Sequence, residues 1–218
     1  IEQVKKELGV DYVVEGSVRR AGNRVRITAT LIQCRDQSQL WTNSFERELE
    51  DVLALQSEVA QAIAREIKVT LTPQEQARIV EGRSVNPEAH DYYLRGRFLT
   101  FKETEEGLRK GLEYFAKAIE KDPGYASPYA GMALAYTYLA DAFAPPREAY
   151  PKAKAAASKA LELDSANAEA HACLGLIKWS YEWEFETADV EFRRALQLNP
   201  NSMDARNFYG LALCGANR

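Results

Sequence analysis

Two different hydrophobic periods divide the chain. In residues 12–47, apolar and polar positions alternate in three runs, with breaks at 21–23 and 35–38, which is typical of strands joined by tight turns. From about residue 51 to 69 the spacing becomes helical, with one apolar stripe formed by Val52, Leu55, Val59, Ile63 and Ile67. The first part is therefore predicted to be a small antiparallel β-meander and a helix that covers one side of the sheet.

From residue 87 onward, helical segments recur with a similar ending. The endings FAKAIEKDP, AASKALELDS and FRRALQLNP share an alanine, at Ala118, Ala160 and Ala195. These alanines are spaced close to the ~34-residue period of a helix-turn-helix solenoid. The pattern predicts three helix pairs and the first helix of a fourth, with an insertion at 141–151 in the second pair.

Small residues at matching offsets support helices that cross closely. Gly96 and Gly111 fall on facing helices of the first pair, and Gly175 and Gly210 take the place of Gly96 in the third and fourth. We expect three segments: an α+β unit at 1–71, a linker helix at 72–86 that opens with the capping box Thr72-Pro73-Gln74-Glu75, and the helical array at 87–218. The abrupt start at residue 1 suggests a fragment of a longer protein.

The array resembles the tetratricopeptide repeat (TPR) pattern, with small residues at helix crossings and an aromatic residue and an alanine before a terminal proline. Residues 9–70, which include GVDYVVEGSVRRAGNRVRITATLI, resemble the end of a TolB amino-terminal or FlgO-like domain. The resemblance implies an α+β fold whose first domain is partial, followed by an all-α TPR superhelix. In bacterial signalling proteins such domains accompany class III nucleotidyl cyclases, winged-helix regulators or Ser/Thr kinases.

Net charge and hydropathy limit the classes of partner that we expect. The formal net charge is −4, which gives no overall attraction to nucleic acid. Arg19, Arg20, Arg24 and Arg26 surround the first turn, and we interpret them as a solvated sheet edge. No apolar run is long enough to span a membrane, so we expect no membrane insertion by this segment. The resemblance implies a soluble segment on either side of a membrane-anchored parent.

The sequence contains no recognisable catalytic or metal-binding pattern. There is no GxSxG or phosphate-binding loop, and the three cysteines are far apart. His90 and His171 stand alone on their helices and are interpreted as structural. The acidic residues Glu46, Glu48, Glu50 and Asp51 are interpreted as complementing a helix dipole. We expect a non-enzyme without cofactor or metal.

Aromatic residues concentrate at 179–185. Packing across a turn is the favoured interpretation of Trp183 and Phe185, and a ligand pocket is the alternative. Trp179 instead falls on the helix face that lines the concave groove in TPR proteins. The resemblance implies a peptide-binding groove formed by Tyr93, Arg97, Ala130, Leu134, Thr137, Ala172, Leu176, Trp179, Asn207 and Leu211.

Such an apolar and aromatic groove suits an extended or helical peptide. We therefore expect a non-catalytic module that binds a protein or peptide, as the sensor or scaffold region of a bacterial signal-transduction protein. The alternative is an oligomerisation or regulatory segment of a class III adenylate or guanylate cyclase, a kinase or a transcriptional regulator, which would make the chain a homo-oligomer. A third hypothesis, without a motif to support it, makes the chain part of a cyclase whose activity resides in this segment.

Overall fold

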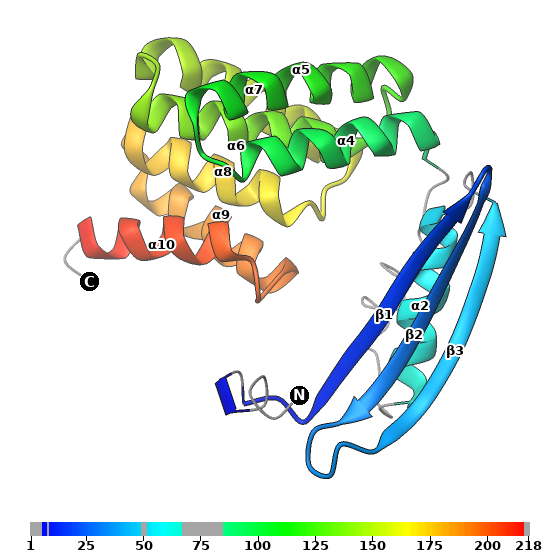
Figure 1. The fold of residues 1–218 in the computed structure, drawn as a ribbon. Coiled ribbons are helices and arrows are strands. Elements are labelled where there is room, and N and C mark those ends of the chain that lie inside the picture. Colours follow the sequence, from blue (N-terminus) through cyan, green and yellow to red (C-terminus); the bar gives the residue numbers. More distant parts are fainter. Residues whose placement is uncertain (1–5, 8, 49–51, 67–84, 216–218) are drawn as a thin grey trace. The chain divides into compact units, whose positions relative to one another are not determined.

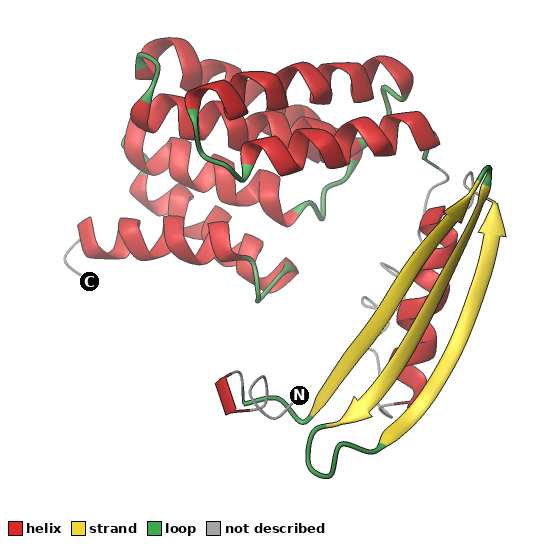
Figure 2. Cartoon of the chain, in the orientation of Figure 1, coloured by secondary structure: helices red, strands yellow, loops and turns green. Residues whose placement is uncertain are grey.

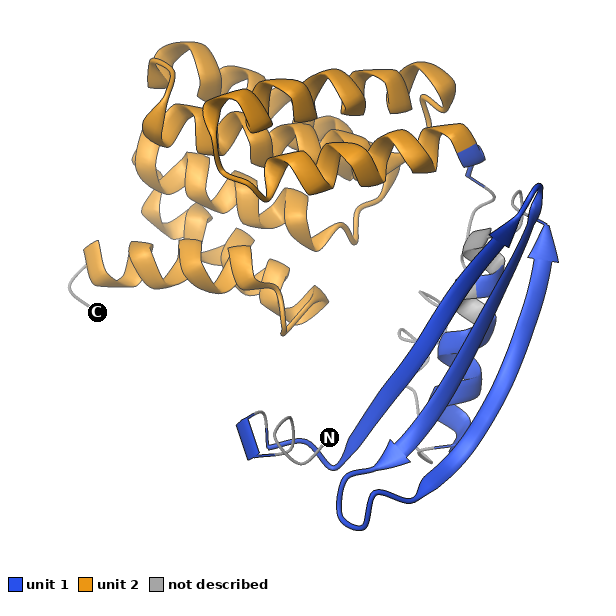
Figure 3. Cartoon of the chain, in the orientation of Figure 1, with its two compact units in different colours: residues 1–87 blue, residues 88–218 orange. Residues whose placement is uncertain are grey.

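The computed structural model describes residues 6, 7, 9–48, 52–66 and 85–215. The chain divides into two compact units, Ile1–Pro87 and Glu88–Arg218 (Figure 3). The capping box at 72–75 and almost all of the expected linker helix at 72–86 lie outside the described residues. None of the helices in the described ranges combines the length and the apolar character that a membrane crossing requires.

The first unit is a three-stranded antiparallel sheet with a helix on one face (Figure 2). The strands β1 (Tyr12–Ala21), β2 (Arg24–Gln33) and β3 (Gln39–Glu48) follow each other in space as in sequence, and α2 spans Val52–Glu66. The β1–β2 turn uses Gly22 in the left-handed region, with φ of 61°. The predicted meander and helix are thus confirmed.

Residues paired across the strands share a face, which explains how the sheet sorts its side chains. On the apolar face, Val25 and Phe45 pack with the fully buried Leu55 of α2. On the opposite face, Arg26 is paired with Glu46 in register, and its Nη2 lies 2.6 Å from a Glu46 carboxylate oxygen. The interpretation of Glu46 as a helix-dipole partner was therefore wrong, because the strand register places Glu46 beside Arg24 and Arg26 of β2, with which it forms ion pairs.

The second unit is a series of antiparallel helices (Figure 1). We call α4 and α5 pair 1, α6 and α7 pair 2, and α8 and α9 pair 3; α10 begins a fourth. A π-helix at Lys178–Glu182 continues α8. The bounds are Pro87–Thr100 (α4), Glu105–Lys121 (α5), Ala126–Ala142 (α6), Pro146–Leu163 (α7), Ala168–Ile177 (α8), Phe185–Leu198 (α9) and Met203–Gly215 (α10).

The predicted small residues do lie where helices cross. A Cβ atom on Gly96 would be 2.6 Å from the Phe115 ring, so only glycine admits this ring. The three anchor alanines, Ala118, Ala160 and Ala195, are fully buried. The insertion in pair 2 does not form a long loop; it lengthens α6 and α7, leaving only residues 143–145 between them. Pro145 and Pro146 fit because they occupy the N-cap and first turn of α7.

Candidate functional site

The residues predicted to form a peptide groove all lie on the first helices of their pairs, but half of them are buried. Tyr93 and Arg97 are partly exposed on α4, and Asn207 and Leu211 are exposed on α10. The buried members are Ala130, Leu134, Thr137, Ala172 and Leu176, each with at most 8% of its surface exposed. These five side chains are covered in this structure, and their part in a peptide groove stays a prediction.

Two side-chain bridges cross the row of first helices that carries these residues. Arg97 of α4 donates a hydrogen bond to the carboxylate of Glu169 on α8, and both side chains are about 20% exposed. Tyr138 of α6 donates from its hydroxyl to Asp204 Oδ1 of α10 at 2.7 Å. Each bridge connects two first helices that have another first helix between them in the series. We call these two bridges the braces.

The groups in the braces are held in a polar environment that is largely closed to water. Burial raises the pKa of Glu169, while the Arg97 guanidinium acts to lower it. Glu169 Oε1 is buried and accepts no hydrogen bond from the described residues. Burial also raises the pKa of Tyr93 to about 12. The Arg97–Glu169 pair is thus largely internal to the array, although one carboxylate oxygen of Glu169 stays without a hydrogen bond from the described residues.

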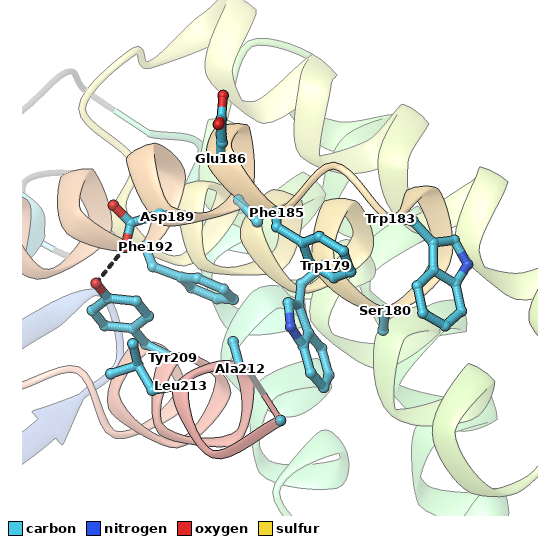
Figure 4. Close-up of a pocket in the computed structure, with 12 residues that line it drawn as sticks. Trp179, Ser180, Trp183, Phe185, Glu186, Asp189, Phe192, Tyr209, Ala212 and Leu213 are labelled. Atoms are coloured by element: carbon cyan, nitrogen blue, oxygen red, sulfur yellow. Dashed lines mark hydrogen bonds between the residues drawn. The ribbon is translucent and has the colours of Figure 1, made fainter. Parts of the chain in front are cut away.

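An open pocket is lined by three aromatic residues of the 179–185 run, Trp179, Trp183 and Phe185 (Figure 4). It has a volume of about 720 Å³ and is formed by the π-helix, the turn after it, α9 and α10. Trp183 is 72% exposed and Phe185 is 51% exposed, so the favoured interpretation, packing between repeats, was wrong for both residues, although their rings contact each other across the turn. The lining residues are Trp179, Ser180, Trp183, Phe185, Glu186, Ala188, Asp189, Phe192, Tyr209, Ala212, Leu213 and Gly215.

Local backbone geometry places these aromatic residues. Trp183 caps the C-terminal end of the π-helix and has φ of 63°, a left-handed conformation that is unusual for a bulky residue. The chain then turns into α9, and the rings of Trp183 and Phe185 meet edge to face with centroids 6.1 Å apart. Both features favour a functional role, because π-helices and strained residues concentrate at such sites.

The floor of the pocket is held by ring stacking and hydrogen bonds. The rings of Phe192 and Tyr209 stack with centroids 5.2 Å apart. The Tyr209 hydroxyl donates to Asp189 Oδ1 at 2.5 Å (Figure 4). Asp189 Oδ2 accepts from Arg193 Nε at 2.7 Å. The pocket therefore offers ordered aromatic surface at its base and exposed rings at its edge, a combination that suits large apolar side chains.

The histidines belong to local hydrogen-bond pairs. His90 Nδ1 lies 3.1 Å from the Tyr125 hydroxyl, and burial lowers the pKa of His90. His171 Nδ1 lies 2.7 Å from a Glu191 carboxylate oxygen. Within the part of the chain that the structure describes, no three His, Cys, Asp or Glu residues are grouped so that they could hold a metal ion.

Comparisons with known proteins give partial matches. No family model matches the chain. A relative named "Putative adenylate cyclase 3", from Rhizobium meliloti (strain 1021), is 37% identical over 134 residues, or 62% of this chain and 23% of the relative. The transcriptional regulator HilA of Salmonella typhimurium is 27% identical over 212 residues, or 96% of this chain and 37% of the relative. The chain thus spans between about a quarter and two fifths of the length of these relatives.

Solved structures similar to the chain are TPR domains. The TPR domain of Arabidopsis OM64 has a TM-score of 0.46 and 20% identity, covering 59% of this chain and 96% of that domain. The Sgt2 TPR domain from Aspergillus fumigatus has a TM-score of 0.48 and 16% identity, covering 61% and 82%. The first TPR of Spaghetti (RPAP3), bound to the HSP90 peptide SRMEEVD, has a TM-score of 0.46 and 18% identity, covering 62% and 98%.

Proposed function

We propose that this chain is a non-catalytic TPR module that binds a protein or peptide, as the sensor or scaffold region of a bacterial signal-transduction protein. The observation that carries the proposal is the aromatic pocket at the end of the array. In the same proposal, residues 1–71 are part of a TolB amino-terminal or FlgO-like domain, residues 72–86 link it to the array, and residues 87–218 are the TPR array. The names of the relatives, a cyclase and a transcriptional regulator, support a regulatory setting.

The pocket supports binding of a protein rather than of a small polar metabolite. Its exposed rings, Trp183 and Phe185, adjoin the stacked pair Phe192 and Tyr209, which together give a broad apolar surface. Tryptophan and tyrosine dominate the binding energy of protein interfaces because one ring buries a large area. Trp179 belongs both to the predicted groove and to the pocket. A partner bound in the pocket would therefore contact one residue of the predicted groove, Trp179.

A crosslinking and titration experiment tests this function. A photoreactive amino acid at position 183, in the parent protein in its own cells, identifies the protein that contacts the pocket. The purified partner is then titrated with the wild-type chain, with Trp183→Ser and with Val190→Ser. Val190 is a suitable control because it is 65% exposed on α9 and does not line the pocket. We expect at least a tenfold loss of affinity for Trp183→Ser alone; equal affinities for the three proteins would refute the assignment.

A specific feature favours the second candidate, an oligomerisation segment. Leu94 and Phe98 on α4 are 51% and 65% exposed, although the corresponding positions of the later first helices are all buried. These later positions are Gly131 and Ala135, Cys173 and Ile177, and Phe208 and Ala212. Such an end face could pair chains and so bring together cyclase, kinase or regulator domains of the parent. Light scattering that gives a monomer mass over a hundredfold range of concentration would count against it.

A further inference from the structure

Four arginines surround the turn between β1 and β2 (Figure 1). Residues 19–26 contain Arg19, Arg20, Arg24 and Arg26 and no acidic residue, although the whole chain has a net charge of −4. The strand register places Arg19 directly opposite Arg26, and Arg24 lies two residues before Arg26 on the same side of β2. These three arginines therefore share the face of the sheet that is opposite to α2, and we call them the arginine cluster.

The stability of the sheet does not explain the arginine cluster. Like charges directly opposite each other on neighbouring strands destabilise a sheet. Glu46 accepts two hydrogen bonds from Arg26 and also pairs with Arg24 at 3.2 Å, so one carboxylate serves two guanidinium groups. The Arg19 side chain forms no ion pair or hydrogen bond with the residues that the structure describes. The cluster therefore keeps an excess of positive charge, and the side chains of Arg24 and Arg26 are 70% and 60% exposed.

The same face carries hydroxyl groups beside the arginines. The side-chain oxygens of Thr28 and Ser44 lie 2.9 Å apart, and those of Thr30 and Thr42 lie 3.0 Å apart. Ser17 adds a further hydroxyl, because it is paired with Thr28 in the register of β1 and β2. Arginine, serine and threonine side chains make many of the contacts that proteins form with the phosphate and sugar groups of nucleic acids. This face of the sheet therefore fits a phosphate backbone.

The apolar and aromatic side chains that other partners would need lie on the opposite face. Val14 and Val18 of β1 are 46% and 69% exposed, but they are paired with residues of the face toward α2. A surface that binds a membrane usually combines its cations with apolar side chains that enter the lipid. Trp41 and Phe45 also lie toward α2, whereas single-stranded nucleic acid is bound by stacking on exposed rings. The arginine cluster thus fits a duplex better than a membrane or a single strand.

We propose that the arginine cluster and the neighbouring hydroxyl groups bind the phosphate backbone of a nucleic acid duplex. Guanidinium groups form two parallel hydrogen bonds with a phosphate group, and the ion pairs with Glu46 orient Arg24 and Arg26 for this contact. The binding is independent of base sequence, because the contacts are made with the backbone. This binding function belongs to the first unit, and it does not depend on the proposed function of the aromatic pocket.

The salt dependence of duplex binding tests the proposal. A fluorescein-labelled DNA duplex of about 20 base pairs is titrated with the 218-residue protein, and anisotropy is recorded between about 20 and 200 mM salt. We expect saturable binding whose association constant, on logarithmic scales, falls with salt concentration with a slope of about −2.7, or about −0.9 for each of three phosphate contacts. In Arg19→Ser the slope should become about −1.8, and the affinity at about 50 mM salt should fall about tenfold.

Arg35→Ser is the matched control, since Arg35 is an exposed arginine in the turn between β2 and β3, at the other end of the same sheet. This variant should bind the duplex with nearly the wild-type affinity and with the same slope. Arg19→Ser should also keep or raise the thermal midpoint of unfolding, because it removes the repulsion between Arg19 and Arg26. A loss of duplex binding in Arg19→Ser then cannot be attributed to unfolding.

Three results with the duplex would overturn the proposal. They are the absence of saturable binding at low salt, a slope that is unchanged in Arg19→Ser, and equal losses of affinity in Arg19→Ser and Arg35→Ser. In parallel titrations the duplex is replaced by vesicles of equal amounts of phosphatidylserine and phosphatidylcholine, and by polyglutamate. Tighter binding to either of these polyanions than to the duplex would also overturn the proposal, and would identify a membrane or an acidic protein as the partner.

Discussion

Replacing Arg97 with methionine should destabilise the helical array strongly. The substitution removes the cation that faces Glu169 and leaves a carboxylate that is only about 20% exposed. Removing one partner of a buried ion pair typically costs about 3–5 kcal/mol. Because the Glu169 side chain keeps some contact with solvent, we expect a somewhat smaller loss, about 2–4 kcal/mol in the free energy of unfolding. The double variant Arg97→Met with Glu169→Gln should recover a large part of this loss.

The assay is urea unfolding followed by far-ultraviolet circular dichroism. Arg95→Met is the control, since Arg95 lies on the same helix and pairs with Asp91 while both side chains are more than half exposed. Exposed pairs of this kind contribute at most about 0.5 kcal/mol. A loss for Arg97→Met as small as that of Arg95→Met, or a double variant as unstable as the single one, would show that solvent stabilises the Glu169 carboxylate without Arg97.

The same experiment has a pH dependence whose sign follows from the raised pKa of Glu169. A carboxyl group with a folded pKa above its ordinary value of 4.5 is more easily ionised in the unfolded chain. Its contribution to stability is fully present below that value and is lost as pH rises through the folded pKa. Without Arg97 the pKa of Glu169 should rise further. The defect of Arg97→Met should therefore shrink as pH falls toward 4.5, and a defect that is constant with pH would contradict this reasoning.

Three further predictions concern single side chains. Trp183→Gly should leave the free energy of unfolding unchanged or raise it by up to about 1 kcal/mol, because glycine relieves the left-handed backbone and the lost ring is largely exposed. A decrease in this free energy, measured by urea unfolding, would mean that the Trp183 ring contributes to packing. Cys214, which is exposed, should react with a thiol reagent in the folded protein, whereas the buried Cys173, whose pKa burial raises, should react only on unfolding. Burial raises the pKa of Tyr93 to about 12, so stability should fall as pH rises from 10 toward 12; absorbance at alkaline pH, recorded with circular dichroism, should show no ionisation of this tyrosine before unfolding.

The architecture of the array could be predicted because its determinants are local. Helical periodicity, the alanines at 118, 160 and 195 and the crossing glycines are all visible in the sequence. The strand register could also have given the Arg26–Glu46 pair, since the two turns of the meander fix which residues face each other. An interpretation of Glu46 from sequence neighbours alone missed this partner.

The site was less predictable because it depends on how tightly successive helices approach. Arg97 and Glu169 are 72 residues apart, and no sequence period indicates that one reaches the other across an intervening helix. The π-helix that positions Trp183 is likewise not indicated by a simple hydrophobic period. A usable signal was nevertheless present: glutamates alternate with aromatic residues in the run YEWEFE, which indicates a surface in water rather than a packed turn.

The braces also affect how the array should come apart. In most repeat proteins each unit contacts only its neighbours, so the ends can fray while the middle remains folded. Here Arg97 and Tyr138 each reach past the adjacent unit to the one beyond it. Opening α4 alone would expose the Glu169 carboxylate on α8, and opening α10 alone would release Tyr138 on α6. The second unit should therefore unfold cooperatively as a single block, and its end helices should be protected almost as well as its centre.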